Sequence, residues 1–414
     1  MAGKRRVIGL VANLVPYHAA RWSAFAERFG GDVFVVETTD RDGFAVLETA
    51  GGEGSFERVT LFEGREASGI GRRELVRRVR ATLERLEPDV VCISGYGFRA
   101  SLAALHWATL QGVPVVVCSE SKRSDSRRHA VQEWLKSRAV RMCAAGLAGG
   151  TPQAGYLAEL GLGRERVFTG YDAVDNRHFA AGADAARAKG NPGRMELGLP
   201  RNFFLACSRF GEKKNLLRLV QAYGRYAGKA ETGKSGNGRV GRGEAWHLVL
   251  VGDGALRGAV EGEIGKLGRG AYAHLAGARG YGELPAHYGL ARAFVHASTT
   301  EQWGLVVNEA MASGLPVLVS NRCGCAPDLV REGVNGHTFD PYDVEGLAEL
   351  MGRVSGSPEA RLKEMGEASQ RIIGGWGTER FAAGLTGAVE KALETAPRRA
   401  SWAERVLLRL LMLR

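Results

Sequence analysis

Short apolar runs alternate with longer stretches of helical periodicity along most of the chain. In the first part, runs that are typical of buried strands lie at residues 6–13, 33–37, 90–94, 113–118 and 143–148. In the second part, similar runs lie at residues 202–208, 246–251, 271–276, 293–297 and 315–320. Strands that alternate with helices are typical of parallel sheets whose two faces are covered by helices. The pattern therefore predicts an α/β protein with doubly wound domains.

The alternation fades between these two parts, where alanine, glycine, arginine and proline dominate the sequence. A chain of 414 residues is expected to form about two domains. We expect a first domain at residues 1–172, a linker at 173–200 and a second domain at 201–374. The remaining residues, 375–414, are expected to form C-terminal helices.

The stretch at residues 298–321, STTEQWGLVVNEAMASGLPVLVSN, lies between two predicted strands of the second domain. It is expected to form a loop and then a short helix. Open parallel sheets bind ligands beyond the carboxyl ends of their strands, where this loop would lie. Glu301 is in the loop and Glu309 is in the second turn of the helix. Ionised carboxylates accept hydrogen bonds from vicinal sugar hydroxyls, although both glutamates could instead be solvated surface residues.

Backbone N–H groups add donors to this region. The predicted helix spans about residues 305–313, and its positive N-terminal end offers the N–H groups of Gly304, Leu305 and Val306, which have no partner within the helix. A second glycine turn, with Gly252 and Gly254, follows the strand at 246–251. Its glycines would allow a ligand to approach the backbone closely, or they could simply form a tight turn.

Glu301 and Glu309 are separated by seven residues, and Gly-Leu-Pro-Val follows the helix. In these features the stretch resembles the E-x7-E signature of retaining glycosyltransferases with the GT-B fold, of the large family 4 type. The resemblance implies two Rossmann-like domains that face each other across a cleft, the first for the acceptor and the second for a nucleotide sugar. It implies that Glu301 contacts the donor sugar and Glu309 the ribose. It also implies that the closing helices, 375–414, cross back to the first domain.

Two cations follow the first strand of the second domain. Arg209 lies at the carboxyl end of this strand and Lys214 lies at the start of the next helix. A guanidinium and an ammonium in these places can clamp a diphosphate and stabilise the charge that it gains on leaving. The family resemblance gives the same assignment, because relatives carry an arginine and a lysine with this spacing. It implies catalytic roles for Arg209, Lys214 and Glu301 without an essential metal.

The acceptor side of the sequence departs from the family pattern. Relatives often carry paired glycines after the first strand, where this chain has Asn13 to His18 instead. They often carry a histidine after the strand at 113–118, where this chain has Glu120. His18 and Glu120 are therefore weak acceptor candidates, and His18 could equally be a structural residue of a helix start.

The preferred interpretation is a transferase that moves a sugar from a nucleotide diphosphate sugar to an acceptor hydroxyl with retention of anomeric configuration. The donor would be a UDP- or GDP-type sugar, with no cofactor and no metal. The acceptor would be a glycan, a lipid-linked molecule or a small molecule of cell-envelope or polysaccharide biosynthesis. The alternatives are a nucleotide-sugar epimerase of the same fold, and a non-catalytic protein that binds nucleotide sugars or polyanions.

The net charge of +11 favours anionic partners. The tail at residues 398–414 has a broad apolar face with a basic flank, which is typical of a helix that lies on a membrane surface, although such a helix could also pack on the domain. Basic motifs interleaved with aromatic residues are lacking, so we expect no nucleic-acid partner. Six cysteines without zinc-site spacing indicate a reducing compartment. We therefore expect a cytoplasmic protein, peripheral to the inner face of the membrane.

Overall fold

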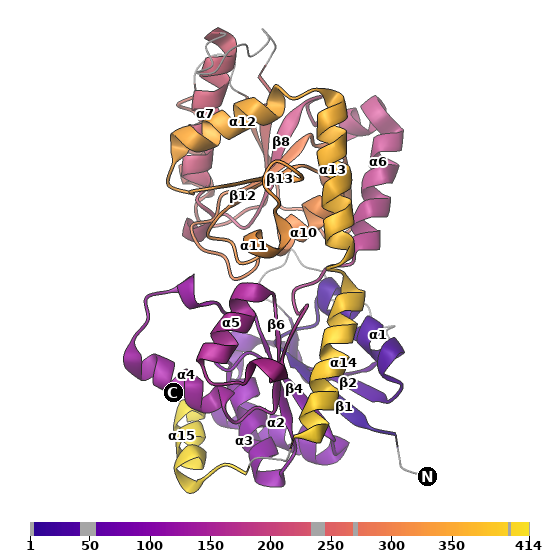
Figure 1. Cartoon of the computed structure of the whole chain (residues 1–414), viewed down its shortest axis with the longest axis vertical. Coiled ribbons are helices and arrows are strands. Elements are labelled where there is room, and N and C mark those ends of the chain that lie inside the picture. The colour runs from indigo at the N-terminus through magenta and orange to yellow at the C-terminus, as the bar shows by residue number, and fades with distance from the viewer. Residues whose placement is uncertain (1–3, 42–54, 233–244, 268–271, 396–398, 414) are drawn as a thin grey trace. The chain divides into compact units, whose positions relative to one another are not determined.

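The computed structural model describes residues 4–41, 55–232, 245–267, 272–395 and 399–413. The chain forms two compact units, each with its own sheet (Figure 1). Unit 1 contains Met1–Asp175 and Trp376–Arg414, and unit 2 contains Asn176–Gly375. The last part of the chain therefore belongs to the same unit as the first part.

Unit 1 is built on a parallel sheet of seven strands. The strands are β1 (Arg6–Val11), β2 (Asp32–Arg41), β3 (Glu57–Glu66), β4 (Val90–Ser94), β5 (Val115–Ser119), β6 (Ala145–Ala148) and β7 (Val167–Thr169). Their order is β3-β2-β1-β4-β5-β6-β7, and every pair is parallel. Strands β1, β4, β5 and β6 are nearly all apolar because both faces of the sheet are buried there, whereas β2 and the edge strand β3 also carry charged residues.

Helices cover both faces of this sheet. Val7 and Val11 of β1 contribute to a core that includes α1 (Pro16–Phe29) and α14 (Thr378–Glu394). Ile8 and Leu10 contribute to a second core that includes α2 (Arg72–Leu86), α3 (Arg99–Gln111), α4 (Ala130–Val140), α5 (Thr151–Glu159) and α15 (Trp402–Leu413). Short 3-10 turns lie at Ala67–Gly69, Arg123–Asp125 and Arg164–Arg166. The doubly wound architecture expected for the first domain is therefore confirmed.

Unit 2 has a parallel sheet of six strands. These are β8 (Phe203–Cys207), β9 (His247–Val251), β10 (Ala273–Gly277), β11 (Ala293–His296), β12 (Val317–Ser320) and β13 (Gly336–Phe339). Their order is β10-β9-β8-β11-β12-β13. The strand order reverses at β8 and β11, so the loops that follow these two strands lie on opposite sides of a switch point, where doubly wound sheets bind ligands.

The helices of unit 2 also lie on both faces of the sheet. They are α6 (Asn176–Glu196), α7 (Leu216–Thr232), α8 (Arg257–Ile264), α9 (Leu284–Leu290), α10 (Leu305–Ala312), α11 (Ala326–Leu329), α12 (Val344–Ser355) and α13 (Glu359–Gly374), with a 3-10 turn at Glu212–Lys214. Helices α7 and α12 pack side by side, and α6 packs against α9 and α10. No described helix is both long and apolar enough to cross a lipid bilayer.

The expected linker at 173–200 is largely helical. Phe179, Ala183 and Ala186 lie on one buried face of α6 and pack on the rest of unit 2. The backbones of α6 and α9 come so close that a Cβ at Gly289 would lie 2.5 Å from the carbonyl oxygen of Ala183. Small residues suit such close packing, so the composition that suggested a linker here marks a tight helix contact.

Candidate functional site

Most of the predicted site residues lie at the carboxyl edge of the sheet of unit 2. Arg209 and Lys214 follow β8, and Gly252 follows β9. Glu301 follows β11, and Gly304 begins α10, which connects β11 to β12. The switch point of the sheet therefore positions residues from three loops that are distant in the sequence.

Glu301 is the centre of a polar cluster. Its Oε2 accepts a hydrogen bond from Nζ of Lys214 and lies 3.3 Å from Oγ of Ser298 and 3.4 Å from Nε2 of His296. Burial alone would raise the pKa of Glu301, but the hydrogen bond from His296 and the charge of Lys214 together lower it far below its ordinary value. The carboxylate of Glu301 therefore stays ionised in any physiological medium.

Lys214 contacts Glu301, whereas the sequence analysis placed it beside a diphosphate. Each side chain is about one-quarter exposed, so the pair lies at the edge of the protein interior. A diphosphate bound by Lys214 would share this cation with Glu301. Arg209, the other predicted clamp residue, is exposed directly after β8.

Asn215 holds the loop after β8 against its neighbours. It adopts a left-handed backbone conformation with φ of 57°. Its Nδ2 donates to the carbonyl oxygens of Ala297, at 3.1 Å, and Pro341, at 2.8 Å. The N–H of Thr299 donates to the carbonyl of Lys213 over 2.8 Å. These contacts fix the loop that carries Lys214 beside the loop that carries Glu301.

Glu309 has a different environment. Its side chain is buried, and Oε2 accepts a hydrogen bond of 2.7 Å from the hydroxyl of Tyr288, which is fully buried. Burial raises the pKa of Glu309 to about 7, although the hydrogen bond from Tyr288 opposes this. The two glutamates of the pattern therefore differ in charge near neutral pH, because His296 and Lys214 keep Glu301 ionised and burial favours the neutral form of Glu309.

The N-terminus of α10 lies between these two glutamates in the sequence. Gly304, with φ of 110°, is its N-cap, and Leu305 and Val306 begin the helix half-buried. Behind them, Nε1 of the buried Trp303 donates to Oδ1 of Asn308 over 2.9 Å. This bond fixes the first turn and its N–H groups, which can donate hydrogen bonds to an oxygen of a ligand.

The glycines after β9 have a structural role. A Cβ at Gly252 would lie 1.8 Å from the carbonyl oxygen of Ser208, and one at Gly254 would lie 2.7 Å from that of Phe210. The turn therefore packs directly on the loop after β8, where the N–H of Phe210 also donates to the carbonyl of Asp253 over 2.8 Å. Contact with a ligand stays a prediction for both glycines.

The two acceptor candidates lie in unit 1. His18 is in the first turn of α1, and its Nδ1 lies 2.9 Å from the carbonyl oxygen of Asn13. Burial and the nearby charge of Arg21 lower the pKa of His18 to about 3, so it is neutral at physiological pH. The hydrogen bond to the carbonyl of Asn13 gives His18 a structural role at the start of α1. Glu120 lies elsewhere in unit 1: it follows β5, and β4 lies between β5 and β1 in the sheet.

Three site residues were missed by sequence reasoning, namely His296, Tyr288 and Asn215. His296 ends a buried strand, and a polar residue in that place was a usable signal. Tyr288 and Asn215 gave no such signal, because each lies in a segment far from the residues it contacts. The described residues contain no group of three or more histidine, cysteine, aspartate or glutamate side chains placed to bind a metal ion.

Two family models match consecutive parts of the chain. The model described as Glycosyl transferase 4-like domain matches residues 17–169, and the model described as Glycosyl transferases group 1 matches residues 194–371. These two matches together cover most of the sequence, and the second contains every site residue predicted in unit 2.

Curated relatives match smaller parts of the chain. The sulfoquinovosyl transferase of Arabidopsis thaliana is 41% identical over 101 residues, which are 24% of this chain and 19% of that protein. The GDP-mannose-dependent alpha-mannosyltransferase of Corynebacterium glutamicum is 26% identical over 276 residues, which are 64% of this chain and 58% of that protein. The chain thus spans about one-fifth of the length of the first relative and three-fifths of the second.

The fold is similar to that of solved glycosyltransferase structures. Anabaena HepE, whose structure was solved in complex with UDP and glucose, superposes with a TM-score of 0.68 and 17% identity, over 92% of this chain and 97% of that one. This likeness extends over both units. The two family models and the shared fold therefore show that the chain belongs to the GT-B glycosyltransferases of the family 4 type.

Proposed function

We propose that the protein transfers a glycosyl group from a nucleotide diphosphate sugar to an acceptor hydroxyl, with retention of anomeric configuration and without an essential metal. The observation that carries this proposal is the cluster of Lys214, His296 and Glu301 beside the N-terminus of α10. It combines a fixed anion, which can accept from sugar hydroxyls, with a cation and backbone donors for phosphate oxygens.

Each site residue has a role in this reaction. Glu301 accepts hydrogen bonds from the donor sugar, and Glu309 accepts them from the ribose. Arg209 and Lys214 stabilise the leaving diphosphate, whose negative charge grows as the bond between the anomeric carbon and the phosphate oxygen breaks. The acceptor oxygen bonds to the anomeric carbon on the same face, and its proton passes to an oxygen of the leaving phosphate.

The identity of the donor is proposed at the level of its class. The Corynebacterium relative is named for GDP-mannose, and HepE was solved with UDP, so both nucleotides are candidates. We further propose an acceptor of cell-envelope or polysaccharide assembly, with the enzyme at the cytoplasmic face of the membrane. Family membership and the excess of basic residues support this choice.

Release of nucleoside diphosphate tests the proposed activity. The purified protein is incubated with UDP- and GDP-sugars, with and without a panel of glycan, lipid-linked and small-molecule acceptors. The proposal predicts one preferred donor, acceptor-dependent release of its nucleoside diphosphate, and a product with the donor's anomeric configuration. Conversion of the donor to an epimer without any acceptor would overturn the proposal.

A further inference from the structure

Unit 1 contains a cavity of about 420 Å³ lined by residues of α2, α3 and α15. Figure 1 labels these three helices. The cavity is formed by the second half of α3, one side of α2 and the last turns of α15. The lining residues are Arg73, Val76, Arg77, Arg80, Ala103, His106, Trp107, Leu110, Gln111, Arg409 and Met412. The proposed glycosyl transfer uses none of these residues.

The charged side chains that line this cavity are all positive. Four arginines line it, and its lining contains no carboxylate. Arg80 is paired with Glu84, whereas Arg73, Arg77 and Arg409 form no hydrogen bond or ion pair with the described residues. A cavity of similar size in unit 2 provides a contrast, because carboxylates line it together with its cations. The cavity in unit 1 is therefore suited to an anion from outside the chain.

The inner wall of the same cavity is apolar. Val76, Ala103, Trp107, Leu110 and Met412 form it, and most of the exposed lining surface belongs to apolar atoms. A small inorganic anion would leave this wall in contact with water. A molecule with both an anionic group and a hydrocarbon chain would cover the wall and meet the arginines.

A further observation agrees with such a ligand. Helix α15 leaves Trp402 80% exposed and Leu410 62% exposed. Exposed tryptophan and leucine beside arginines are typical of a surface that contacts the headgroup region of a bilayer.

We propose that this cavity binds one anionic phospholipid of a bilayer. The phosphate contacts Arg73, Arg77 and Arg409, and an acyl chain lies along the apolar wall. Trp402 and Leu410 of α15 enter the headgroup region beside the bound lipid. This inference concerns attachment to a membrane and stands independently of the proposed glycosyl transfer.

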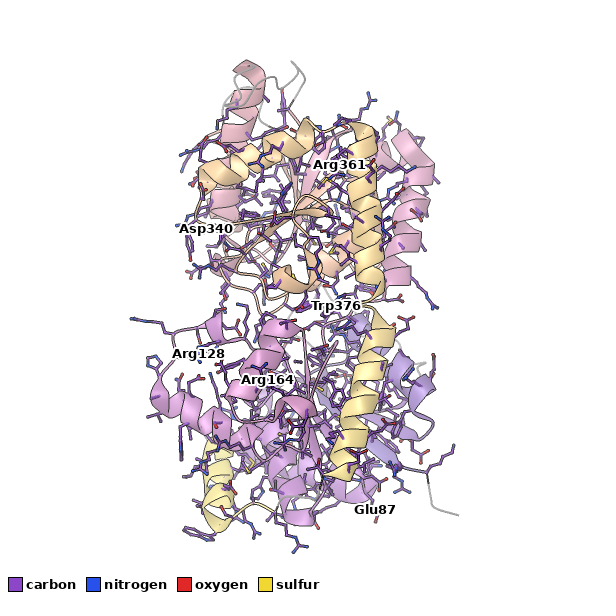
Figure 2. All side chains as sticks on the ribbon, in the orientation of Figure 1. Glu87, Arg128, Arg164, Asp340, Arg361 and Trp376 are labelled. Atoms are coloured by element: carbon purple, nitrogen blue, oxygen red, sulfur yellow. The ribbon has the colours of Figure 1, made fainter. Side chains whose placement is uncertain are left out.

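Vesicle co-sedimentation tests this inference on the full chain. Vesicles of phosphatidylcholine with and without phosphatidylglycerol are compared for wild type and for Arg73→Gln/Arg77→Gln. Each basic residue near an anionic surface contributes about fivefold in affinity, so the double variant should bind roughly 25-fold more weakly. The matched control is Arg85→Gln/Arg164→Gln, which removes the same charge from exposed positions of unit 1 outside the cavity (Figure 2 labels Arg164). This control should stay within about twofold of wild type.

A soluble probe separates the cavity from general surface charge. Short-chain phosphatidylglycerol should stabilise wild type against heat, whereas inorganic phosphate should not. Val76→Trp, which fills the cavity without changing its charge, should abolish that stabilisation. Equal losses of vesicle binding in the two arginine variants, equal effects of phosphate and short-chain lipid, or no vesicle binding would each overturn the inference. Donor nucleotide binding is measured on every variant and is expected to be unchanged.

Discussion

A glutamate with a pKa near neutrality distinguishes the two carboxylates of the site. Glu309 is only 7% exposed and has the neutral hydroxyl of Tyr288 as its partner, so burial raises its pKa to about 7. A carboxyl group must be ionised to accept hydrogen bonds from a ribose diol with both oxygens. Donor binding and folding stability should therefore respond to pH in opposite directions.

The affinity for a nucleotide diphosphate sugar should rise with pH through the pKa of Glu309. The ionised fraction of this group changes about tenfold between one unit below and one unit above the pKa, and the affinity should change similarly. Calorimetric titration with a nucleotide sugar measures this change, because its diphosphate diester does not titrate in that range. Glu309→Gln should remove most of the pH dependence, and an unchanged dependence in this variant would refute the assignment.

Folding stability should change in the other sense. The folded-state pKa of Glu309 lies above its ordinary value of 4.5, so its contribution to stability is present below that value and is lost as the pH rises through about 7. The loss amounts to about 3 kcal/mol of the free energy of unfolding. Denaturant unfolding of wild type and Glu309→Gln across this range should show a difference that falls with pH, and a constant difference would argue against it.

Lys214 should matter more for turnover than its neighbour Lys213. Lys214 reaches the carboxylate of Glu301, while the side chain of Lys213 is exposed. Loss of a donor that stabilises developing charge typically lowers kcat by 100- to 1,000-fold. We therefore expect the kcat of Lys214→Ala to be lower than that of wild type by roughly this factor. Lys213→Ala is the matched control and should retain activity within about twofold. Equal losses in steady-state assays of both variants would contradict the role of Lys214.

For single residues of the site, the sequence indicated the residue types better than their contacts. The spacing of Glu301 and Glu309 pointed to both carboxylates, but their opposite pKa shifts depend on His296 and Lys214 beside Glu301 and on the burial of Glu309. Lys214 is 87 residues from Glu301 in the sequence, and only the sheet brings them together. A pattern read along one segment does not contain this information.

Elements of unit 2 position the site through close backbone contacts. The turn after β9 packs on the loop after β8 at Gly252, whose φ of 134° is seldom adopted by other residues. The sequence left open whether this glycine lies close to a ligand or simply forms a tight turn, because a glycine turn before a helix suits both. In the structure the glycine allows the two loops to pack, since the space for a Cβ is occupied by the carbonyl of Ser208.

Gly252→Ala should therefore destabilise the protein. Steric overlap and an unfavourable φ together are expected to cost about 3 kcal/mol in the free energy of unfolding. Gly211→Ala is the matched control, because no atom lies within 4 Å of its Cβ position and its φ is −128°. Thermal or denaturant unfolding compares the two variants. Similar stabilities would show that the two loops do not pack as described.

Helix α15 shows how a terminal amphipathic pattern can serve two purposes. The sequence left open whether the tail lies on a membrane or packs on its domain. In the structure Leu408 and Met412 are buried in the core of unit 1, while Trp402 and Leu410 remain exposed. Part of the apolar face thus stabilises the unit, and the rest is left for a partner.

Leu408→Ala should cost about 2–5 kcal/mol of the free energy of unfolding, since it leaves a cavity in a packed core. Leu410→Ala, on the exposed side of the same helix, should change stability by less than about 0.5 kcal/mol. Denaturant unfolding of the two variants measures the difference. A result in which Leu408→Ala is as stable as wild type would mean that α15 does not pack on unit 1.

The whole molecule follows the sequence pattern closely in its general plan. Apolar runs and helical periodicity predicted two doubly wound units, and both sheets are present with parallel strands. The helix α6 was missed because its small residues obscure the helical pattern. The cavity of unit 1 could not be predicted, because it requires α15, from the end of the chain, to pack against α2 and α3.

The central claim is that the site at β8, β11 and α10 binds a nucleotide diphosphate sugar. The most direct test is thermal unfolding with UDP, GDP and their sugars, for wild type, Glu309→Ala and the exposed control Glu349→Ala. A ligand at a hundredfold excess over its Kd stabilises by about 2.7 kcal/mol. The account predicts this stabilisation by one nucleotide class in wild type and Glu349→Ala, and a weaker effect in Glu309→Ala. Stabilisation by none of these ligands, or equal stabilisation of all three proteins, would contradict it.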